Sequence, residues 1–450
     1  MEKDVLIFGV PFFVNLQISK IFINFVFESG PAGIINRLGG KFTLSQSINL
    51  NRKFKPALIF TGTEMLDGDQ VLVTSASGTI LDIIPRRDAG DDIQELDGIL
   101  SPGFVNAHCH IELSHMKGVI PMHTGLVEFV KQIILKREST LPGTSPEEHF
   151  EKLLDLKHDA MDNAVEELWN SGTVAIGDIC NTADSIELKA NSNLYWHNFI
   201  EVSGFVDAVA KKRLTAAESI LASFNTRHSH FGNTITPHAP YSVSRALFNL
   251  LNEQTSGNII SIHNQEAQAE NELYLQKTGD FLGLYKDLGI NIDSFLPTGR
   301  SSLRSWLPLF THNQKIISAH NTFMSDTDLQ ALPGILGNKV LFFCVCINAN
   351  LYIENRLPPL EMMVSHHCNI VLGTDSYASN QQLNMLEEIK TIRSSYPQFS
   401  LATILQWATL NGAKALGIES KFGSFEKGKT PGLVLIKKDL SGSQLLRPGY

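Results

Sequence analysis

The stretch Leu100-Ser-Pro-Gly-Phe-Val-Asn-Ala-His108-Cys-His110 ends an apolar run with two histidines on alternate residues. Side chains two residues apart lie on the same face of a strand. We therefore predict a strand over residues 99–105, with both imidazoles facing one point just beyond its end. Neutral imidazole nitrogen is a common ligand for Zn²⁺ or Fe²⁺. On this stretch alone, two histidines in a turn without a metal are an equally good interpretation.

The composition of the 450-residue chain is that of a globular protein, with 43% hydrophobic residues and a mean hydropathy of -0.01. This length suits one large α/β unit with an appendage. The formal net charge is -9, and no run of Lys or Arg is present, so we expect neither nucleic acid nor a membrane as a partner. The five cysteines have no framework spacing, which favours a cytoplasmic location.

Residues 1–54 do not share the pattern of the rest of the chain. Their apolar pieces, residues 5–14 and 21–27, are shorter than the roughly 20 residues that span a bilayer. A signal peptide is the alternative, but no small-x-small cleavage site follows closely. We interpret this segment as an unassigned extension that is poorly ordered or precedes the true start. The intact mass of the native protein would decide between these two.

Strand-like and helix-like segments then alternate along the chain. Two distant segments, residues 55–97 and 426–450, carry short β-like runs, and we predict that they form one small β-sandwich domain. Between them, residues 98–425 alternate between the two types, and the clearest helix runs from a capping box at Ser145-Pro-Glu-Glu148 to Gly172. The expected strands are 99–105, 173–176, 194–202, 234–236, 259–263, 315–319, 340–345 and 369–372. Such alternation favours parallel pairing, and eight strands close a (β/α)8 TIM barrel.

Polar residues follow the predicted strands at the rim where the active sites of such barrels lie. His238 follows the fourth strand, and His263 ends the fifth, with Glu266 three residues later. His320 ends the sixth strand, and Asp375 follows the eighth. Each residue alone is better explained as a loop or cap residue. Their coincidence with His108 and His110 at one rim predicts a metal-dependent site.

These motifs together resemble the amidohydrolase superfamily, and more narrowly its cytosine, guanine, S-adenosylhomocysteine and triazine aminohydrolase branch. The resemblance covers residues 56–437. Pro237-His238-Ala-Pro-Tyr241 resembles the substrate-side motif of S-adenosylhomocysteine and methylthioadenosine deaminases. Asn106-Ala-His-Cys-His-Ile-Glu-Leu-Ser114 is similar to aminofutalosine deaminases. The chain departs from the family's Cys-Pro-x-Ser/Ala-Asn motif at Cys346-Ile-Asn-Ala-Asn350.

The resemblance implies a set of roles for these residues. One divalent ion, Zn²⁺ or else Fe²⁺, would be held by His108, His110, His263 and Asp375. Members with two metals carry a bridging lysine after strand four, and residues 235–244 contain none. Asp375 would also accept the proton of a metal-activated water, which His320 orients, and Glu266 would protonate the ring and the leaving amine. The candidate substrate contacts are His238, Glu112 and Tyr241.

The predicted function is metal-dependent hydrolytic deamination of a purine-like base or nucleoside, with aminofutalosine as the first candidate. One alternative is hydrolysis of another ring C–N or C–halogen bond, as in enzymes of the triazine, guanine or cytosine type. Another is a catalytically silent barrel that serves as a scaffold, although none of the implied metal ligands is missing. As the resemblance implies, we expect a homodimer that takes a small heterocyclic substrate.

Overall fold

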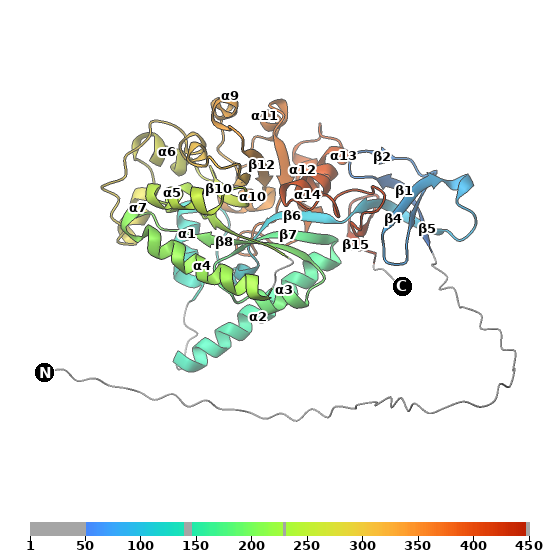
Figure 1. The fold of residues 1–450 in the computed structure, drawn as a ribbon, viewed down its shortest axis with the longest axis horizontal. Helices are drawn as coiled ribbons and strands as arrows, with labels where there is room; N and C mark the ends of the chain where they lie inside the picture. The colour runs from blue at the N-terminus through green and yellow to red at the C-terminus, as the bar shows by residue number, and fades with distance from the viewer. Residues whose placement is uncertain (1–50, 139–145, 228–230, 447–450) are drawn as a thin grey trace, which may run out of the picture. The chain divides into compact units, whose positions relative to one another are not determined.

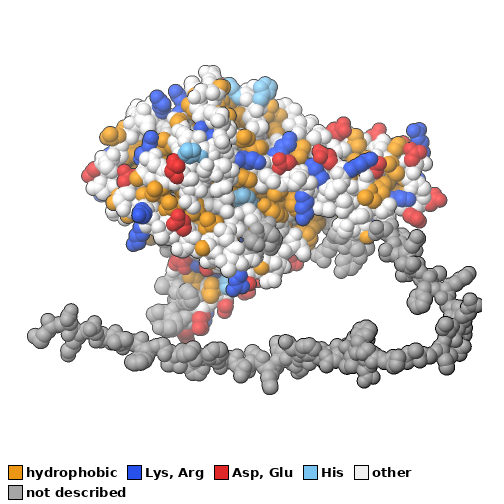
Figure 2. Space-filling view, in the orientation of Figure 1, with side chains coloured by type: hydrophobic (Ala, Val, Ile, Leu, Met, Phe, Trp, Pro, Cys, Tyr) orange, Lys and Arg blue, Asp and Glu red, His pale blue; other side chains and the backbone are white. Residues whose placement is uncertain are grey.

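The computed structural model describes residues 51–138, 146–227 and 231–446 (Figure 1). The predicted extension lies outside this range except for its last residues, because strand β1 already begins at Arg52. Ser145, the predicted cap of the clearest helix, also lies outside the described residues. None of the helices in the described ranges has the length and apolar character needed to cross a membrane. Figure 2 shows basic and acidic side chains interspersed over the visible face of the molecule.

Segments from both ends of the described chain join one seven-stranded sheet, drawn largely in blue in Figure 1. Its strands are β1 (Arg52–Phe60), β2 (Met65–Leu66), β3 (Gln70–Thr74), β4 (Ile80–Pro85), β5 (Gln94–Pro102), β14 (Leu433–Ile436) and β15 (Ser443–Leu445). Strand β14 pairs antiparallel with β5, and β5 pairs parallel with β1. Buried side chains such as Phe54, Leu100 and Leu433 form a core on this sheet. The described strands pair in a single sheet, so the predicted β-sandwich is not confirmed.

The eight predicted strands between these segments are present and pair in parallel. One four-stranded sheet contains β6 (Phe104–Cys109), β7 (Thr173–Cys180), β8 (Tyr195–Val202) and β9 (Gly232–Pro237). The other contains β10 (Ile259–Asn264), β11 (Lys315–His320), β12 (Val340–Val345) and β13 (Asn369–Leu372). Side chains from both sheets, including Ala107, Phe199, Ile317 and Phe342, share one buried apolar cluster. Strands buried on both faces are typical of a parallel sheet covered by helices.

The two four-stranded sheets meet at both edges. At the edge between β9 and β10, the His263 N–H donates to the His238 carbonyl at 2.9 Å. At the edge between β13 and β6, the N–H groups of Thr374 and Asp375 both donate to the His108 carbonyl at 3.1 Å. These are isolated hydrogen bonds, and in the described ranges no continuous ladder joins the sheets. The fold is α/β as predicted, and closure of the TIM barrel is not confirmed.

Helices follow most of the parallel strands, as the alternating pattern predicts. They are α1 (Leu126–Lys136), α2 (Pro146–Asn170), α3 (Ile186–Asn191), α4 (Ala210–Arg227), α5 (Arg245–Gln254), α6 (Gln268–Gln276), α7 (Phe281–Asp287), α8 (Ser302–Trp306), α9 (Asp326–Ile335), α10 (Ile347–Glu354), α11 (Leu360–Ser365), α12 (Met385–Ser395), α13 (Leu401–Gln406) and α14 (Gly412–Ala415). Helix α5 begins where its sequence signal lies, because the Ser244 hydroxyl accepts a hydrogen bond from the Leu247 N–H. The sequence analysis did not predict α1, α3, α6, α10, α11, α12, α13 or α14.

The predicted strand over residues 99–105 is wrong in one respect, because the chain changes sheet at Gly103. Strand β5 ends at Pro102, which has no N–H to continue a ladder, and β6 begins at Phe104. The Gly103 N–H donates instead to the Pro431 carbonyl at 3.1 Å. A Cβ at Gly103 would lie 2.7 Å from that carbonyl oxygen and would overlap the methyl groups of Val174. His108 therefore lies within β6 rather than beyond the end of the strand.

We expect Gly103→Ala to lower the free energy of unfolding by about 1–3 kcal/mol, because the added methyl group overpacks this junction. Gly283 is the matched control. It lies inside α7, and an added Cβ there would meet no atom within 4 Å. Gly283→Ala should raise the free energy of unfolding by about 0.5–1 kcal/mol. Denaturant titrations of both variants measure this, and equal changes in the two would contradict the account of the junction.

Candidate functional site

Three imidazoles converge at the ends of two strands. His108 lies on β6, His110 follows directly after it, and His263 lies near the end of β10. The Nε2 atom of His110 lies 3.2 Å from Nε2 of His108 and 3.1 Å from Nε2 of His263. All three side chains are buried. The structure therefore brings together residues that are 153 positions apart in the chain.

Asp375 completes this group from the loop after β13, beside β6. Its Oδ1 atom lies 3.4 Å from Nε2 of His110 and 3.7 Å from Nε2 of His108. Its Oδ2 atom accepts a hydrogen bond from the Ser379 hydroxyl at 2.5 Å. The Asp375 backbone has φ +58°, a left-handed conformation that is uncommon for a residue with a side chain. Such strain persists only where surrounding contacts enforce it, and it is often found at functional sites.

His320 and Glu266 lie next to the three imidazoles. Nε2 of His320 lies 3.6 Å from Oε1 of Glu266 and has no hydrogen-bond partner in the described part of the chain. The Nδ1–H of His320 donates to the Asn350 side-chain oxygen at 2.9 Å, and this hydrogen bond orients the ring. Asn350 is the last residue of Cys346-Ile-Asn-Ala-Asn350, the segment that differs from the family motif. Burial raises the pKa of Glu266 well above its ordinary value, and the negative charge of Asp375 adds to the shift. This direction of the pKa shift favours the protonated form of Glu266.

Burial keeps the converging imidazoles neutral. It lowers the pKa of His108 and His263 well below the ordinary value and that of His110 to about 3, and the neighbouring histidines add to each shift. The His263 Nδ1–H donates to the His238 carbonyl at 2.8 Å, so the lone pair of this ring is on Nε2, which faces the cluster. Neutral rings with their lone pairs directed at one point are the form of histidine that binds metal.

The donor atoms suit a single divalent cation. Ligand atoms of His108, His110 and His263 lie within 4.8 Å of one another, and those of His108, His320 and Asp375 form an overlapping group. The Nε2 atoms of these buried rings lie 3.1–3.2 Å apart. A neutral imidazole has only one N–H, so lone pairs that face one another are stabilised by a cation between them. Three imidazole nitrogens and one carboxylate oxygen match the preferences of Zn²⁺ and Fe²⁺. The residues present therefore fit the predicted metal.

His238 and Tyr241 lie beside the cluster. His238 follows β9; its ring centroid is 4.9 Å from that of His263, and its Nδ1 atom is 2.6 Å from the Ser242 hydroxyl. Tyr241 is buried, with its ring stacked on Phe281 and its edge toward His238 at 5.6 Å between centroids. Both residues are close enough to the imidazoles to contact a substrate, and that role stays a prediction.

Glu112 is directed elsewhere than the other predicted residues. Its carboxylate accepts hydrogen bonds from the backbone N–H groups of Asn181 at 2.9 Å and Thr182 at 3.1 Å, in the loop after β7. Burial raises its pKa to about 7. In this arrangement Glu112 holds the loop after β7, and its predicted role as a substrate contact is not supported by any group it faces.

Two features of the site were missed from the sequence. Asp178, near the end of β7, accepts a hydrogen bond from the Ile111 N–H at 2.9 Å and forms a fully buried ion pair with Lys189 at 2.6 Å. Glu201, near the end of β8, lies 3.9 Å from Nδ1 of His263. The only signal for either residue was a carboxylate inside an otherwise apolar strand pattern.

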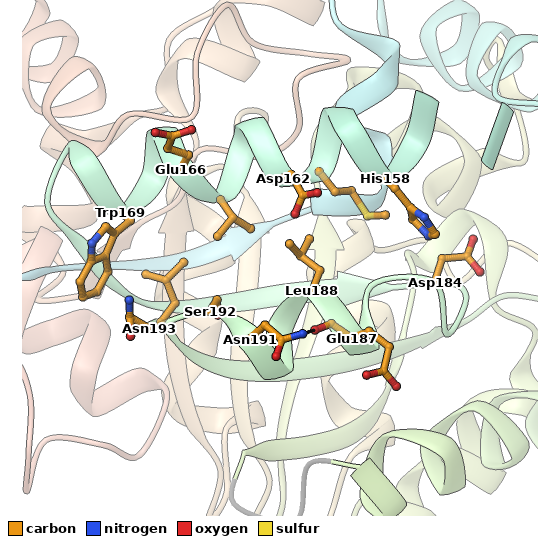
Figure 3. Close-up of a pocket in the computed structure, with 13 residues that line it drawn as sticks. His158, Asp162, Glu166, Trp169, Asp184, Glu187, Leu188, Asn191, Ser192 and Asn193 are labelled. Carbon is orange, nitrogen blue, oxygen red and sulfur yellow. Dashed lines mark hydrogen bonds between the residues drawn. The ribbon is translucent and has the colours of Figure 1, made fainter. Parts of the chain in front are cut away.

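A separate hollow of about 510 Å³ lies between α2 and α3 (Figure 3). Asp162, Glu187 and Trp169 are among the side chains that line it. None of the predicted site residues is in its lining. The chemistry of the imidazole cluster is therefore independent of this hollow.

Comparison with known proteins gives consistent matches. Residues 99–446 match the model of the Amidohydrolase family. The chain is 30% identical over 366 residues to 5'-deoxyadenosine deaminase of Methanococcus vannielii, in an alignment that covers 77% of each protein. It is 25% identical over 398 residues to aminodeoxyfutalosine deaminase of Nitratiruptor sp., which covers 86% of this chain and 91% of that protein.

Solved structures share the fold. Helicobacter pylori aminofutalosine deaminase in complex with methylthio-coformycin superposes with a TM-score of 0.68 at 21% identity, covering 88% of this chain and 98% of that chain. An adenosine deaminase of Xanthomonas campestris with bound zinc superposes with a TM-score of 0.65 at 21% identity, covering 86% and 84% of the two chains.

We expect His263→Ala to lose the bound metal, because it removes one of the three converging nitrogens. His312→Ala is the control, since His312 is exposed and pairs with Glu253. Metal content by mass spectrometry of the digested protein, with circular dichroism to verify folding, measures the effect. A folded His263→Ala protein with the metal content of the wild type would show that the ligand set is wrong.

Proposed function

The chain belongs to the amidohydrolase family, and on that premise we propose that it is a metal-dependent hydrolytic deaminase of adenine-type nucleosides. Aminofutalosine is the first substrate to test. The observation that carries the proposal is the buried Glu266 carboxyl, whose Oε1 lies 3.6 Å from Nε2 of His320 beside the imidazole cluster. The similarity to 5'-deoxyadenosine deaminase and aminodeoxyfutalosine deaminase supports the same reaction.

Deamination of an amino-bearing ring carbon needs three proton movements. Water must lose a proton as it adds to the carbon, the ring nitrogen must gain one, and the amine must be protonated before it leaves as ammonia. His108, His110, His263 and Asp375 would hold a divalent ion, which would lower the pKa of a bound water toward neutrality. Asp375 accepts the proton of the attacking water, and His320, held by Asn350, orients the water. Glu266 delivers its proton to the ring nitrogen and so neutralises the negative charge that develops there during the attack. It then takes the proton of the new hydroxyl group and passes it to the amine, which leaves as ammonia, and the proton held by Asp375 restores Glu266.

We also propose finer features that go with this activity. Zn²⁺ is the metal, with Fe²⁺ as the alternative, and the zinc-bound structural neighbour supports this choice. Residues 98–425 form the catalytic barrel, which is consistent with the hydrogen bonds at both sheet edges. Residues 55–97 and 426–450 form the small β domain beside it. The protein works as a homodimer in the cytoplasm; light scattering on the purified protein measures the oligomeric state.

Glu266→Gln should keep the metal and lower turnover by a factor of about 10² or more, because the amide cannot donate the proton that the carboxyl supplies. Glu253→Gln is the matched control, since Glu253 is exposed and its carboxylate pairs with His312 rather than with a residue of the cluster. Steady-state ammonia release and metal content are measured on the same preparations. Unchanged turnover of Glu266→Gln would remove Glu266 from the reaction.

The substrate is tested with metal-loaded protein on aminofutalosine, S-adenosylhomocysteine, methylthioadenosine, 5'-deoxyadenosine, adenosine, guanine and cytosine. We expect ammonia release from adenine nucleosides with kcat/KM above that for the free bases. Release of ammonia from guanine or cytosine alone, or release of chloride from a chlorotriazine alone, would favour the alternative ring hydrolases. No release from any compound by protein with full metal content would contradict the proposed function.

A further inference from the structure

Glu201 is a buried carboxylate with half of its hydrogen-bonding capacity unused. Its side chain is 9% exposed, and Oε1 accepts a hydrogen bond from the Asn181 side chain at 2.9 Å. Oε2 is buried and has no hydrogen-bond partner in the described ranges. No Lys or Arg forms an ion pair with it within these ranges. A buried acceptor without a partner is unfavourable, so this oxygen calls for a donor that the chain itself does not supply.

The unused oxygen faces the candidate site. Oε2 lies 3.9 Å from Nδ1 of His263, and ligand atoms of Glu201, His238 and His263 lie within 4.8 Å of one another. Strand β8 pairs with β9, and β9 meets β10, so Glu201 and Glu266 reach the cluster from opposite sides of β9. Glu201 can therefore contact a substrate without competing with the proton donor.

A second metal ion does not explain this group. Nδ1 of His263 donates its proton to the His238 carbonyl at 2.8 Å and so has no lone pair for a cation next to Glu201. Nδ1 of His238 is next to the Ser242 hydroxyl at 2.6 Å. What remains at this position is one carboxyl oxygen without a hydrogen-bond partner in the described ranges, beside two neutral rings, and this suits an uncharged hydroxyl donor.

We propose that Glu201 is a specificity-determining residue that accepts a hydrogen bond from a sugar hydroxyl of the substrate, an inference that rests on the proposed deaminase function. A nucleoside carries hydroxyl donors outside its reacting ring, and a free base carries none. Sites with a buried polar group discriminate strongly against analogues that leave this group unpaired. Glu201 would therefore favour ribonucleosides over free bases and over the analogue that lacks the bound hydroxyl.

The test compares wild type, Glu201→Gln and Glu201→Leu on adenosine, its 2'-deoxy, 3'-deoxy and 5'-deoxy analogues, and adenine. We expect the wild type to lose about 10- to 100-fold in kcat/KM when the bound hydroxyl is removed. Both variants should lose a similar factor on adenosine, mostly through KM, and should no longer distinguish adenosine from that analogue. Glu187→Gln, an exposed carboxylate on α3, is the control for the change in charge.

Several results would overturn the proposal. One is an unchanged preference among the analogues in folded Glu201→Gln. Another is an equal loss of kcat/KM by the Glu201 variants on all substrates, including adenine. A loss of metal from the Glu201 variants would also overturn it, and so would two metal ions per chain in the wild type. If the wild type releases no ammonia, the proposed function fails separately. Thermal stabilisation by the same nucleosides then decides: a hydroxyl-dependent shift that Glu201→Gln abolishes supports the proposal, and no such shift overturns it.

Discussion

The site depends on one backbone acceptor, the carbonyl of His108. The N–H groups of Thr374 and Asp375 both donate to it, and the Asn106 side chain makes two further hydrogen bonds with Thr374 at 2.7 and 3.1 Å. These contacts join the first parallel strand to the loop after the last. They hold Asp375 in its left-handed conformation and place its carboxylate beside Nε2 of His110. Without this junction, the three imidazoles would lack the carboxylate that completes the donor set.

Low polarity then determines the protonation states. The burial that keeps the imidazoles neutral also makes an unpaired charge unfavourable, so charged side chains near them need a partner of opposite charge. Burial alone would lower the pKa of Lys189, but the Asp178 carboxylate 2.6 Å away raises it. Because Asp178 also binds the Ile111 N–H, this ion pair holds the turn directly after His110. Removing one partner would leave an uncompensated buried charge beside the site, which is more costly than the loss of a surface pair.

The sequence predicts features that depend on local pattern and fails where distant contacts decide. The parallel strands and the polar residues at their ends follow from apolar periodicity, which is a property of each segment. The change from β5 to β6 at Gly103 depends on a hydrogen bond to Pro431, which is more than 300 residues away, so no local pattern indicates it. The direction of Glu112 depends on backbone amides after β7, and the position of Glu201 depends on how β8, β9 and β10 align. These are tertiary facts that a single sequence does not contain.

Two carboxylates at this rim show how environment separates roles. Burial raises the pKa of both Glu266 and Glu201, but their neighbours differ. Glu266 faces the negative charge of Asp375, which raises its pKa further and favours a proton donor. Asp375 also raises the pKa of Glu201, but there the His263 ring and the Asn181 side chain lower it, and the Asn181 amide donates a hydrogen bond to Oε1. The family relationship accounts for the first group, because the reaction needs an acid. Glu201 would instead determine which substrate binds, and the selectivity for substrate would then depend on the ends of β8 and β9.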